Sequence, residues 1–422
     1  MQPKHKMLGN TPVRAGRAET VWSARWTWCW CWCLFLAWYP AEATDYYLSQ
    51  KAGNDTSEGR TPEAPWKSVA RVNRTAFRAG DRILLHAGES WPEELRPRSS
   101  GGEGLPIIFT SYGPGARPVL DGWDDEVEGK LRSIGKGRVT KTHAANAREV
   151  AIDNNEQSHI VYDGLDLRHV LEGVRIYSWA SAIRDITIQN CNIQTETSVD
   201  GQIASAGIYA STKKGTILDL HVYKNHFVPY PVQLDHWGIY FVQGVSRFSI
   251  EDNNFGPAGE DAITVWHSAY GEILRNRGGG NGENTIDVKD SHDILIRDND
   301  ADLDREYNIV VHSVDSPNST YNILVGHNRC LRGGQGGKLT AGVALLFAQK
   351  SGIEDNMIDS AYGAGILIDD VHPGQQNWAS GNRLAGNGTG QKLPAIVLQG
   401  DSDADLPRNQ VAPASTHKGA IQ

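Results

Sequence analysis

The sequence is poor in cysteine and has no excess of basic residues. Only five of its 422 residues are Cys, and three of them lie in one short segment, Cys29, Cys31 and Cys33. The two that remain, Cys191 and Cys330, are too few for a disulfide framework. Lys and Arg number 41 against 50 Asp and Glu, a net charge of −9, which argues against a nucleic-acid partner. Phosphate-binding loops, zinc-ligand spacings and serine-nucleophile motifs are absent.

The first 43 residues differ from the rest of the chain. Five Lys and Arg precede an apolar run from Trp26 to Trp38, and Ala41-Glu42-Ala43 follows with small residues in the first and third places. This order is typical of a secretory signal peptide, and the run is too short for a comfortable membrane span. We expect residues 1–43 to be removed and the protein to be secreted, extracellular or periplasmic. The mature chain then has 36 basic and 48 acidic residues, a balance of −12, and no membrane span.

The middle of the chain repeats every 23 residues. The segments GEDAITVW, GENTIDVK and REYNIVVH begin at Gly259, Gly282 and Arg305. A second column, an Ile followed three residues later by an Asn, keeps the same step at Asn253, Asn276 and Asn299. Weaker spacings of 26 to 35 residues add the candidates Asn190, Asn225, Asn328, Asn356 and Asn382. Two independent columns with one period indicate a repeat fold.

A coil of this length with two or three short strands is typical of a parallel β-helix. Each strand pairs with its equivalents one coil above and below, so Ile263, Ile286 and Ile309 would stack inside. The Asn column predicts a ladder of side-chain amides bonded from coil to coil. We therefore expect one all-β domain over residues 44–422, with a cap region at 44–100, coils at 101–400 and a tail at 401–422.

The cap region has its own pattern. We expect a strand over Tyr46–Ser49, a helix that opens near Pro65, and a strand over Arg82–His86. The helix would cover the open end of the coil, which otherwise exposes strand edges.

This stretch resembles the start of secreted right-handed parallel β-helix proteins of the pectate-lyase-like superfamily. The matching segments are Tyr46-Tyr47-Leu48-Ser49, Gly53-Asn54-Asp55, Pro65-Trp66-Lys67-Ser68, Gly80-Asp81-Arg82-Ile83 and Pro118-Val119-Leu120-Asp121-Gly122. Together with the coils, the resemblance covers most of residues 44–400. It implies a right-handed β-helix and a polysaccharide-active protein, with the family 9 lyases as the nearest family.

Two files of polar side chains are expected on one outer face. Alternate residues of a strand face opposite sides, so Trp266 faces outward where Ile263 and Val265 face inward. The first outward file, one residue per coil, is Trp266, Lys289 and His312. The second is Glu260, Glu283 and Glu306.

β-Elimination of a uronic-acid polymer needs a base and a group that neutralises the sugar carboxylate. The resemblance implies that Lys289 is the base, assisted by His312 or Arg305. It also implies calcium, a hard cation that prefers oxygen ligands, bound by Glu260, Asp261, Glu283 and Asp287. Trp266, Tyr240 and Glu306 are the expected substrate-binding residues.

The favoured hypothesis is a monomeric polysaccharide lyase with an acidic polysaccharide as its partner. A glycoside hydrolase that uses two of Glu260, Asp261, Glu283 and Asp287 as acid and base is the first alternative. A carbohydrate-binding β-helix without catalytic activity is the second. The Gly-His-Gly and Arg-Ile-Lys elements of polygalacturonases and the DPHD motif of mannuronan epimerases are absent.

Overall fold

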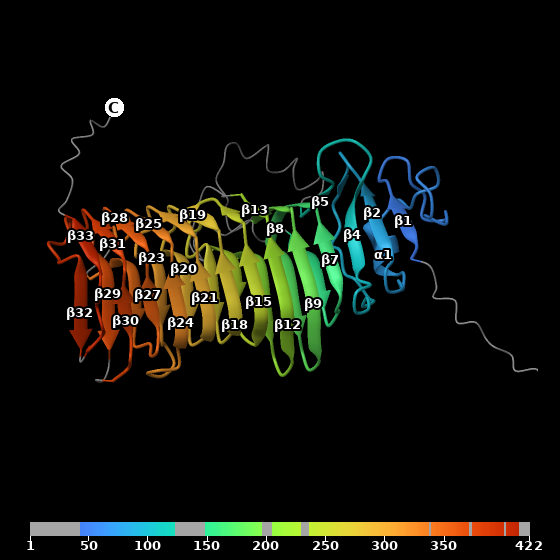
Figure 1. Ribbon diagram of the computed structural model, residues 1–422. Helices are drawn as coiled ribbons and strands as arrows, with labels where there is room; N and C mark the ends of the chain where they lie inside the picture. Colours follow the sequence, from blue (N-terminus) through green and yellow to red (C-terminus); the bar gives the residue numbers. More distant parts are fainter. Residues whose placement is uncertain are drawn as a thin grey trace, which may run out of the picture. The chain divides into compact units, whose positions relative to one another are not determined.

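The computed structural model describes residues 43–122, 148–195, 205–228, 236–336, 339–370, 374–400 and 402–412. Almost all of their regular structure is β-strand, and neighbouring strands pair in parallel along the stack of coils in Figure 1. The fold is the expected right-handed parallel β-helix, with up to three strands in each coil. The expected leader, residues 1–43, lies outside the described residues except for its last one.

The first sheet has twelve strands, each paired with its equivalent in the next coil. Its strands are β1 (Asp45–Leu48), β2 (Arg82–His86), β4 (Ile107–Tyr112), β7 (Ile160–Asp163), β9 (Ala182–Gln189), β12 (Thr216–Tyr223), β15 (Val245–Glu251), β18 (Ala269–Leu274), β21 (His292–Arg297), β24 (Tyr321–Gly326), β27 (Gly352–Glu354) and β30 (Trp378–Ser380).

The second sheet is made mostly of short strands that follow the first turn of each coil. They are β3 (Ser90–Trp91), β5 (Val119–Asp121), the start of β8 (Asp166–Ser178), β10 (Asn192–Thr195), β13 (His226–Phe227), β16 (Asn254–Phe255), β19 (Arg277–Gly279), β22 (Asp300–Asp302), β25 (Arg329–Leu331), β28 (Met357–Asp359), β31 (Arg383–Ala385) and β33 (Gln410–Ala412).

The third sheet carries the candidate site on its outer face. It consists of β6 (Arg148–Asn155), the remainder of β8, β11 (Ser205–Thr212), β14 (His236–Phe241), β17 (Ile263–Trp266), β20 (Asn284–Lys289), β23 (Tyr307–His312), β26 (Ala341–Leu346), β29 (Ala364–Asp370) and β32 (Ile396–Gly400).

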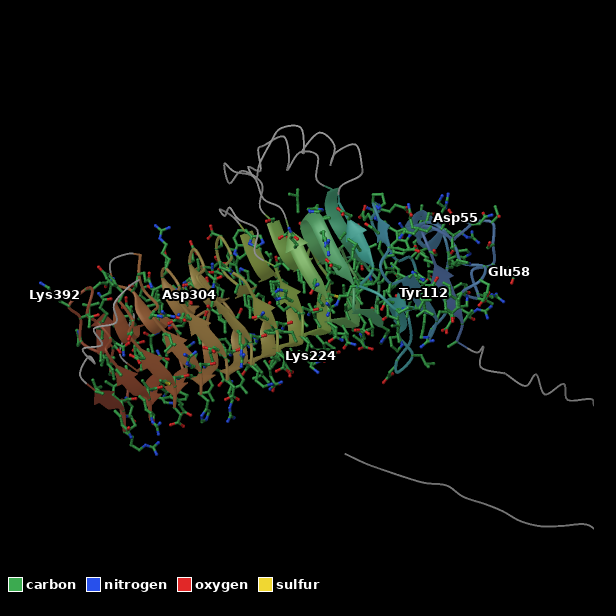
Figure 2. All side chains as sticks on the ribbon, turned by 90° about the horizontal axis from the view of Figure 1, so that it is seen from above. Asp55, Glu58, Tyr112, Lys224, Asp304 and Lys392 are labelled. Carbon is green, nitrogen blue, oxygen red and sulfur yellow. The ribbon has the colours of Figure 1, made fainter. Side chains whose placement is uncertain are left out.

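The core is a column of aliphatic side chains inside the coils. Ile263 pairs in register with Ile286, and Ile286 with Ile309, and none of the three is exposed to solvent. Exposed polar side chains such as Lys224 project outward (Figure 2). Equivalent positions in successive coils therefore pack against one another. Burial of these apolar columns supplies the main stabilisation of the fold.

An Asn ladder occupies the turn between the first and second sheets. The backbone N–H and the side-chain Nδ2 of each Asn both donate to the Oδ1 of the next one along the axis, in the order Asn225, Asn253, Asn276, Asn299, Asn328, Asn356, Asn382 and Asn409. The prediction that Asn190 belongs to this ladder is wrong. Asn190 adopts a left-handed backbone conformation at the corner, and the next residue, Cys191, takes the ladder position and donates its N–H to Asn225.

The amino-terminal region contains one short helix, α1 (Val69–Asn73), which begins four residues after the expected position. The backbone of Trp66 is still paired with the first strand, because its N–H donates to the Tyr47 carbonyl. Ser68 then caps the helix by accepting from the N–H of Arg71. Val69 and Val72 are buried in the core at this end of the chain. That the helix closes the coil stays a prediction. No helix among the described residues is long and apolar enough to cross a bilayer.

Candidate active site

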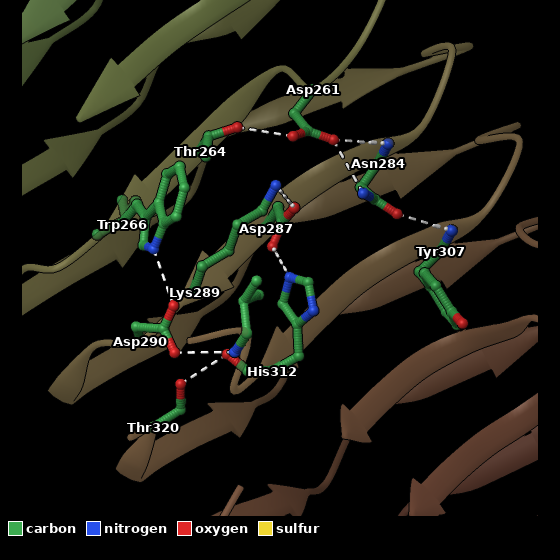
Figure 3. A network of polar contacts seen from close by, with 12 residues as sticks. Asp261, Thr264, Trp266, Asn284, Asp287, Lys289, Asp290, Tyr307, His312 and Thr320 are labelled. Atoms are coloured by element: carbon green, nitrogen blue, oxygen red, sulfur yellow. Dashed lines mark hydrogen bonds and ion pairs between the residues drawn. The ribbon is translucent and has the colours of Figure 1, made fainter. Parts of the chain in front are cut away.

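The expected polar file lies on the outer face of the third sheet, across β17, β20 and β23. Trp266 pairs in register with Lys289, and Lys289 with His312. Two residues earlier on the same strands, Thr264 pairs with Asp287. Figure 3 shows these side chains together on one face. The 23-residue period therefore brings residues from three coils within contact of one another.

Asp287 is at the centre of this group. Its carboxylate receives the Lys289 ammonium at 2.8 Å and His312 Nε2 at 2.9 Å, one on each oxygen, and the residue is only 2% exposed (Figure 3). Burial alone would raise the pKa of this carboxyl, but the charge and hydrogen bond of His312, followed by those of Lys289, outweigh burial and hold the pKa below its usual value. Asp287 is therefore ionised at neutral pH.

Asp261 has the opposite protonation behaviour, although it is one coil away. One of its oxygens accepts the backbone and side-chain N–H groups of Asn284, at 3.1 and 2.9 Å, and the other is 2.7 Å from Thr264 Oγ1. Complete burial, with the nearby charge of Asp287 as the next cause, raises its pKa to about 8. Two neighbouring carboxyl groups thus differ in charge at neutral pH.

The three glutamates form the expected second file. Glu283 donates its backbone N–H to the carbonyl of Glu260, and Glu306 donates to that of Glu283, so the residues stack one coil apart. Burial, together with a hydrogen bond and charge repulsion from Glu260, raises the pKa of Glu283 to about 7. The preceding Gly282 permits this stacking, because a Cβ atom there would lie 1.7 Å from the carbonyl oxygen of Gly259.

The state of Lys289 does not suit a general base. Burial alone would lower the pKa of its amine, but the carboxylates of Asp287 and Asp261 outweigh burial and raise the pKa above its usual value. An amine that removes a proton at neutral pH needs the reverse shift. In this geometry Lys289 is a fixed cation that keeps Asp287 ionised.

Trp266 faces outward as expected and is held in place. Its Nε1 donates to Asp290 Oδ2 at 2.8 Å, and its ring stacks on His267 with centroids 5.1 Å apart. Asp290 also accepts the backbone N–H of Val314 at 2.8 Å, which ties the next coil to this turn. Asp290 was not predicted from the sequence, although it directly follows Lys289 in the chain and could have been found from that position.

The other expected residues surround this centre. Tyr240 is half-buried and stacks on Trp237 with ring centroids 4.7 Å apart, and burial raises its pKa. Arg305 is exposed at the turn before β23. Across the described ranges, no hydrogen bond or ion pair joins Arg305 to Asp287, Lys289 or His312. The catalytic, substrate-binding and metal roles assigned from sequence stay predictions.

The donor atoms limit where a metal ion could bind. A calcium ion at Asp261 and Asp287 would have to displace the contacts that both carboxyl groups already make, so the calcium set stays a prediction. In the part of the chain that the structure describes, one group of three possible ligands has its donor atoms within 4.8 Å of one another, namely His267, Asp290 and Asp315. His267 and Asp315 already form an ion pair at 3.1 Å.

Comparisons with known proteins give partial matches. The family model "Periplasmic copper-binding protein (NosD)" matches residues 238–410, which is less than half of the chain. Copper favours several nitrogen or sulfur ligands, whereas the group at His267 offers one imidazole and two carboxylates. This group has no thiolate or thioether, the soft ligands that select Cu(I).

Two curated relatives are glycosidases by name. A lacto-N-biosidase of Bifidobacterium longum is 31% identical over 86 residues, which is 19% of this chain and 5% of the relative. An alpha-1,3-galactosidase A of Akkermansia muciniphila is 23% identical over 184 residues, 42% of this chain and 29% of the relative. The chain thus spans less than a third of either relative.

A solved structure agrees with the fold. The GH136 lacto-N-biosidase from Eubacterium ramulus superposes with a TM-score of 0.64 at 18% identity, covering 87% of this chain and 67% of that one. At this identity the likeness shows the fold alone. The strand pairing and this likeness agree on the parallel β-helix fold, whereas an affiliation with the family 9 lyases stays a prediction.

Proposed function

We propose that the protein is a glycoside hydrolase that acts at the outer face of β17, β20 and β23. The observation that carries the proposal is the difference in protonation among neighbouring carboxyl groups: at neutral pH Asp287 is ionised, Asp261 is mostly protonated, and Glu283, with a pKa of about 7, is protonated in about half of the molecules. Glycoside hydrolysis needs one carboxylate and one carboxylic acid beside the scissile bond.

The accessible member of the protonated pair is the better acid. Asp261 is completely buried, whereas Glu283 is only partly buried. We therefore assign Glu283 as the general acid that protonates the leaving oxygen. Asp287, which is 2% exposed and bonded through both oxygens, is assigned as the ionised carboxylate that stabilises the positive charge of the transition state. Lys289 and His312 fix Asp287 in its ionised state, and Trp266 provides an apolar face for a sugar ring.

The names of the two curated relatives support a neutral glycan substrate. Both names denote hydrolysis of glycosidic bonds, of a lacto-N-bioside and of an α-1,3-linked galactoside. The family description "periplasmic" supports action outside the cytoplasm.

The test is product analysis on a panel of lacto-N-oligosaccharides, α-1,3-galactosides and uronans. We expect new reducing ends without an ultraviolet-absorbing unsaturated end. Glu283→Gln and Asp287→Asn should each lower kcat by about 100-fold or more. The matched controls, Glu272→Gln on the first sheet and the exposed Asp298→Asn, should retain activity. Full activity of Asp287→Asn would overturn the assignment.

A polysaccharide lyase is the second candidate. The observation in its favour is that Lys289 and His312 lie side by side on the outer face, where the Lys289 ammonium could neutralise a uronate carboxylate. Since Lys289 is held protonated, His312 would be the base in this case. Unsaturated products from a uronan, lost in His312→Gln, would favour the lyase over the hydrolase.

A further inference from the structure

A second pocket lies on the same outer face, nearer the amino terminus. It has a volume of about 370 Å³ and lies on β6, β8 and β11 and the turn after β8. Its lining includes Asp153, Asn155, Glu172, Arg175, Trp179 and Tyr209. None of these residues belongs to the site described above.

Trp179 at this pocket is exposed yet held in position. The side chain is 52% exposed, although a large aromatic residue is normally more buried. Tyr177 contacts it edge-to-face at 5.2 Å, and the Lys213 ammonium lies 4.9 Å from the ring centroid. Its backbone N–H donates to the carboxylate of Glu156. A fixed, exposed indole is a ready surface for stacking, because little conformational entropy is lost when a ligand binds.

The two acids that line the pocket, Asp153 and Glu172, are each paired with an arginine, of which Arg175 lines the pocket and Arg96 lies outside the lining. Arg175 Nε donates to Glu172 Oε2 at 2.6 Å, and Arg96 Nε lies 3.1 Å from Asp153 Oδ2. Each acid thus has a cationic partner. Hydrogen-bond donors and acceptors lie next to one another in the pocket. Such a surface suits the hydroxyl groups of a neutral sugar better than a uronate, which would need an excess of positive charge.

The pocket lies on the same sheet as the proposed active site. The register partners across five neighbouring strands are Arg175, Tyr209, Tyr240, Thr264 and Asp287. Tyr209 lines the pocket and contacts the Tyr240 ring at 6.1 Å. Four strand spacings separate Arg175 from Asp287, which is about 19 Å and leaves room for several sugar units between them.

We propose that this pocket is a remote subsite, in which a neutral sugar unit of a long substrate stacks on Trp179. The inference rests on the proposed function, since it supposes that a glycan lies along the third sheet. It deepens that function by predicting that the protein prefers long, uncharged oligosaccharides to disaccharides.

The experiment compares the wild type with Trp179→Ala, Trp179→Phe and, as a control, Tyr270→Ala, which removes a similarly exposed aromatic residue from the first sheet. The substrates are lacto-N-biose glycosides with two sugar units and lacto-N-oligosaccharides with six. We expect Trp179→Ala to raise KM for the six-unit substrate about tenfold with kcat unchanged, and Trp179→Phe to restore most of the loss. KM for the two-unit substrate should change less than about twofold in all variants.

Calorimetric binding of the six-unit oligosaccharide to the Asp287→Asn background separates the two proposals. If that protein binds the oligosaccharide and Trp179→Ala weakens binding, the subsite stands even where no hydrolysis is found. If the wild type hydrolyses the oligosaccharide and Trp179→Ala leaves KM unchanged, the subsite is overturned and the hydrolase stands. Failure to bind any neutral oligosaccharide, or tighter binding of oligouronates at Trp179, also overturns the subsite.

Discussion

The Asn ladder allows a stability prediction whose size can be worked out from its contacts. Asn276 makes four hydrogen bonds through its side chain: Oδ1 accepts the N–H and Nδ2 of Asn253, at 3.1 and 3.0 Å, and Nδ2 donates to the Ile250 carbonyl at 2.8 Å and to Asn299 Oδ1 at 3.1 Å. The residue is completely buried, so in Asn276→Ala no solvent replaces these partners. At about 1 kcal/mol for each lost bond, we expect the free energy of unfolding to fall by about 4 kcal/mol.

The assay is urea unfolding followed by tryptophan fluorescence and far-ultraviolet circular dichroism. The matched control is Asn254→Ala, one position after a rung, where an exposed side chain makes one bond to His226 at 3.1 Å. That change should cost less than about 0.5 kcal/mol. Asn276→Asp keeps the acceptor oxygen but places a carboxylate oxygen against two other oxygens, so its loss should be smaller at acid pH. Equal effects of Asn276→Ala and Asn254→Ala would refute the reasoning.

Three further predictions concern the titrating groups of the site. Activity should fall as pH rises through about 7, because the general acid Glu283 then loses its proton, and a pH profile of kcat/KM checks this. Asp261 binds its proton more tightly when folded, with a pKa of about 8 against an ordinary 3.8, so its contribution to stability is present at acid pH and is lost as pH rises from about 4 to 8. Asp261→Asn should flatten that part of the stability profile, whose slope is at most about 1.4 kcal/mol per pH unit; an unchanged profile contradicts the raised pKa. Lys289→Met should raise the pKa of Asp287 and move the acid limb of the pH–activity profile to higher pH. An acid limb at the same pH as in the wild type would mean that Lys289 does not keep Asp287 ionised.

Where the period was regular, the sequence predicted the register. In the coils from Asn253 to His312 a constant 23-residue step placed Trp266, Lys289 and His312 in one file, because strand pairing in a β-helix joins equivalent positions. The same step placed Glu283 between Glu260 and Glu306. Side-chain alternation then predicted the direction in which each residue faces.

Where coil length varied, much less could be predicted. Asn190 looked like a ladder residue, but the ladder position is one residue later, at Cys191. Only the backbone conformation at the corner shows this shift. Trp179 and Tyr209 come from coils without the regular step, so the second pocket had no sequence signal. The protonation states of Lys289 and Asp287 depend on contacts shorter than 3 Å, which residue spacing cannot supply.

The stacking of equivalent positions also has a consequence for how this chain could change in length. One residue added to a strand would turn the inward-facing side chains of that strand outward and break a rung of the Asn ladder. A whole 23-residue coil, in contrast, could be added or removed with every stacked column intact. The natural unit of insertion is therefore the coil. Each coil added between Arg175 and Asp287 would lengthen the distance between the pocket and the proposed active site by one strand spacing, about 4.8 Å, and so change the length of glycan that can reach both.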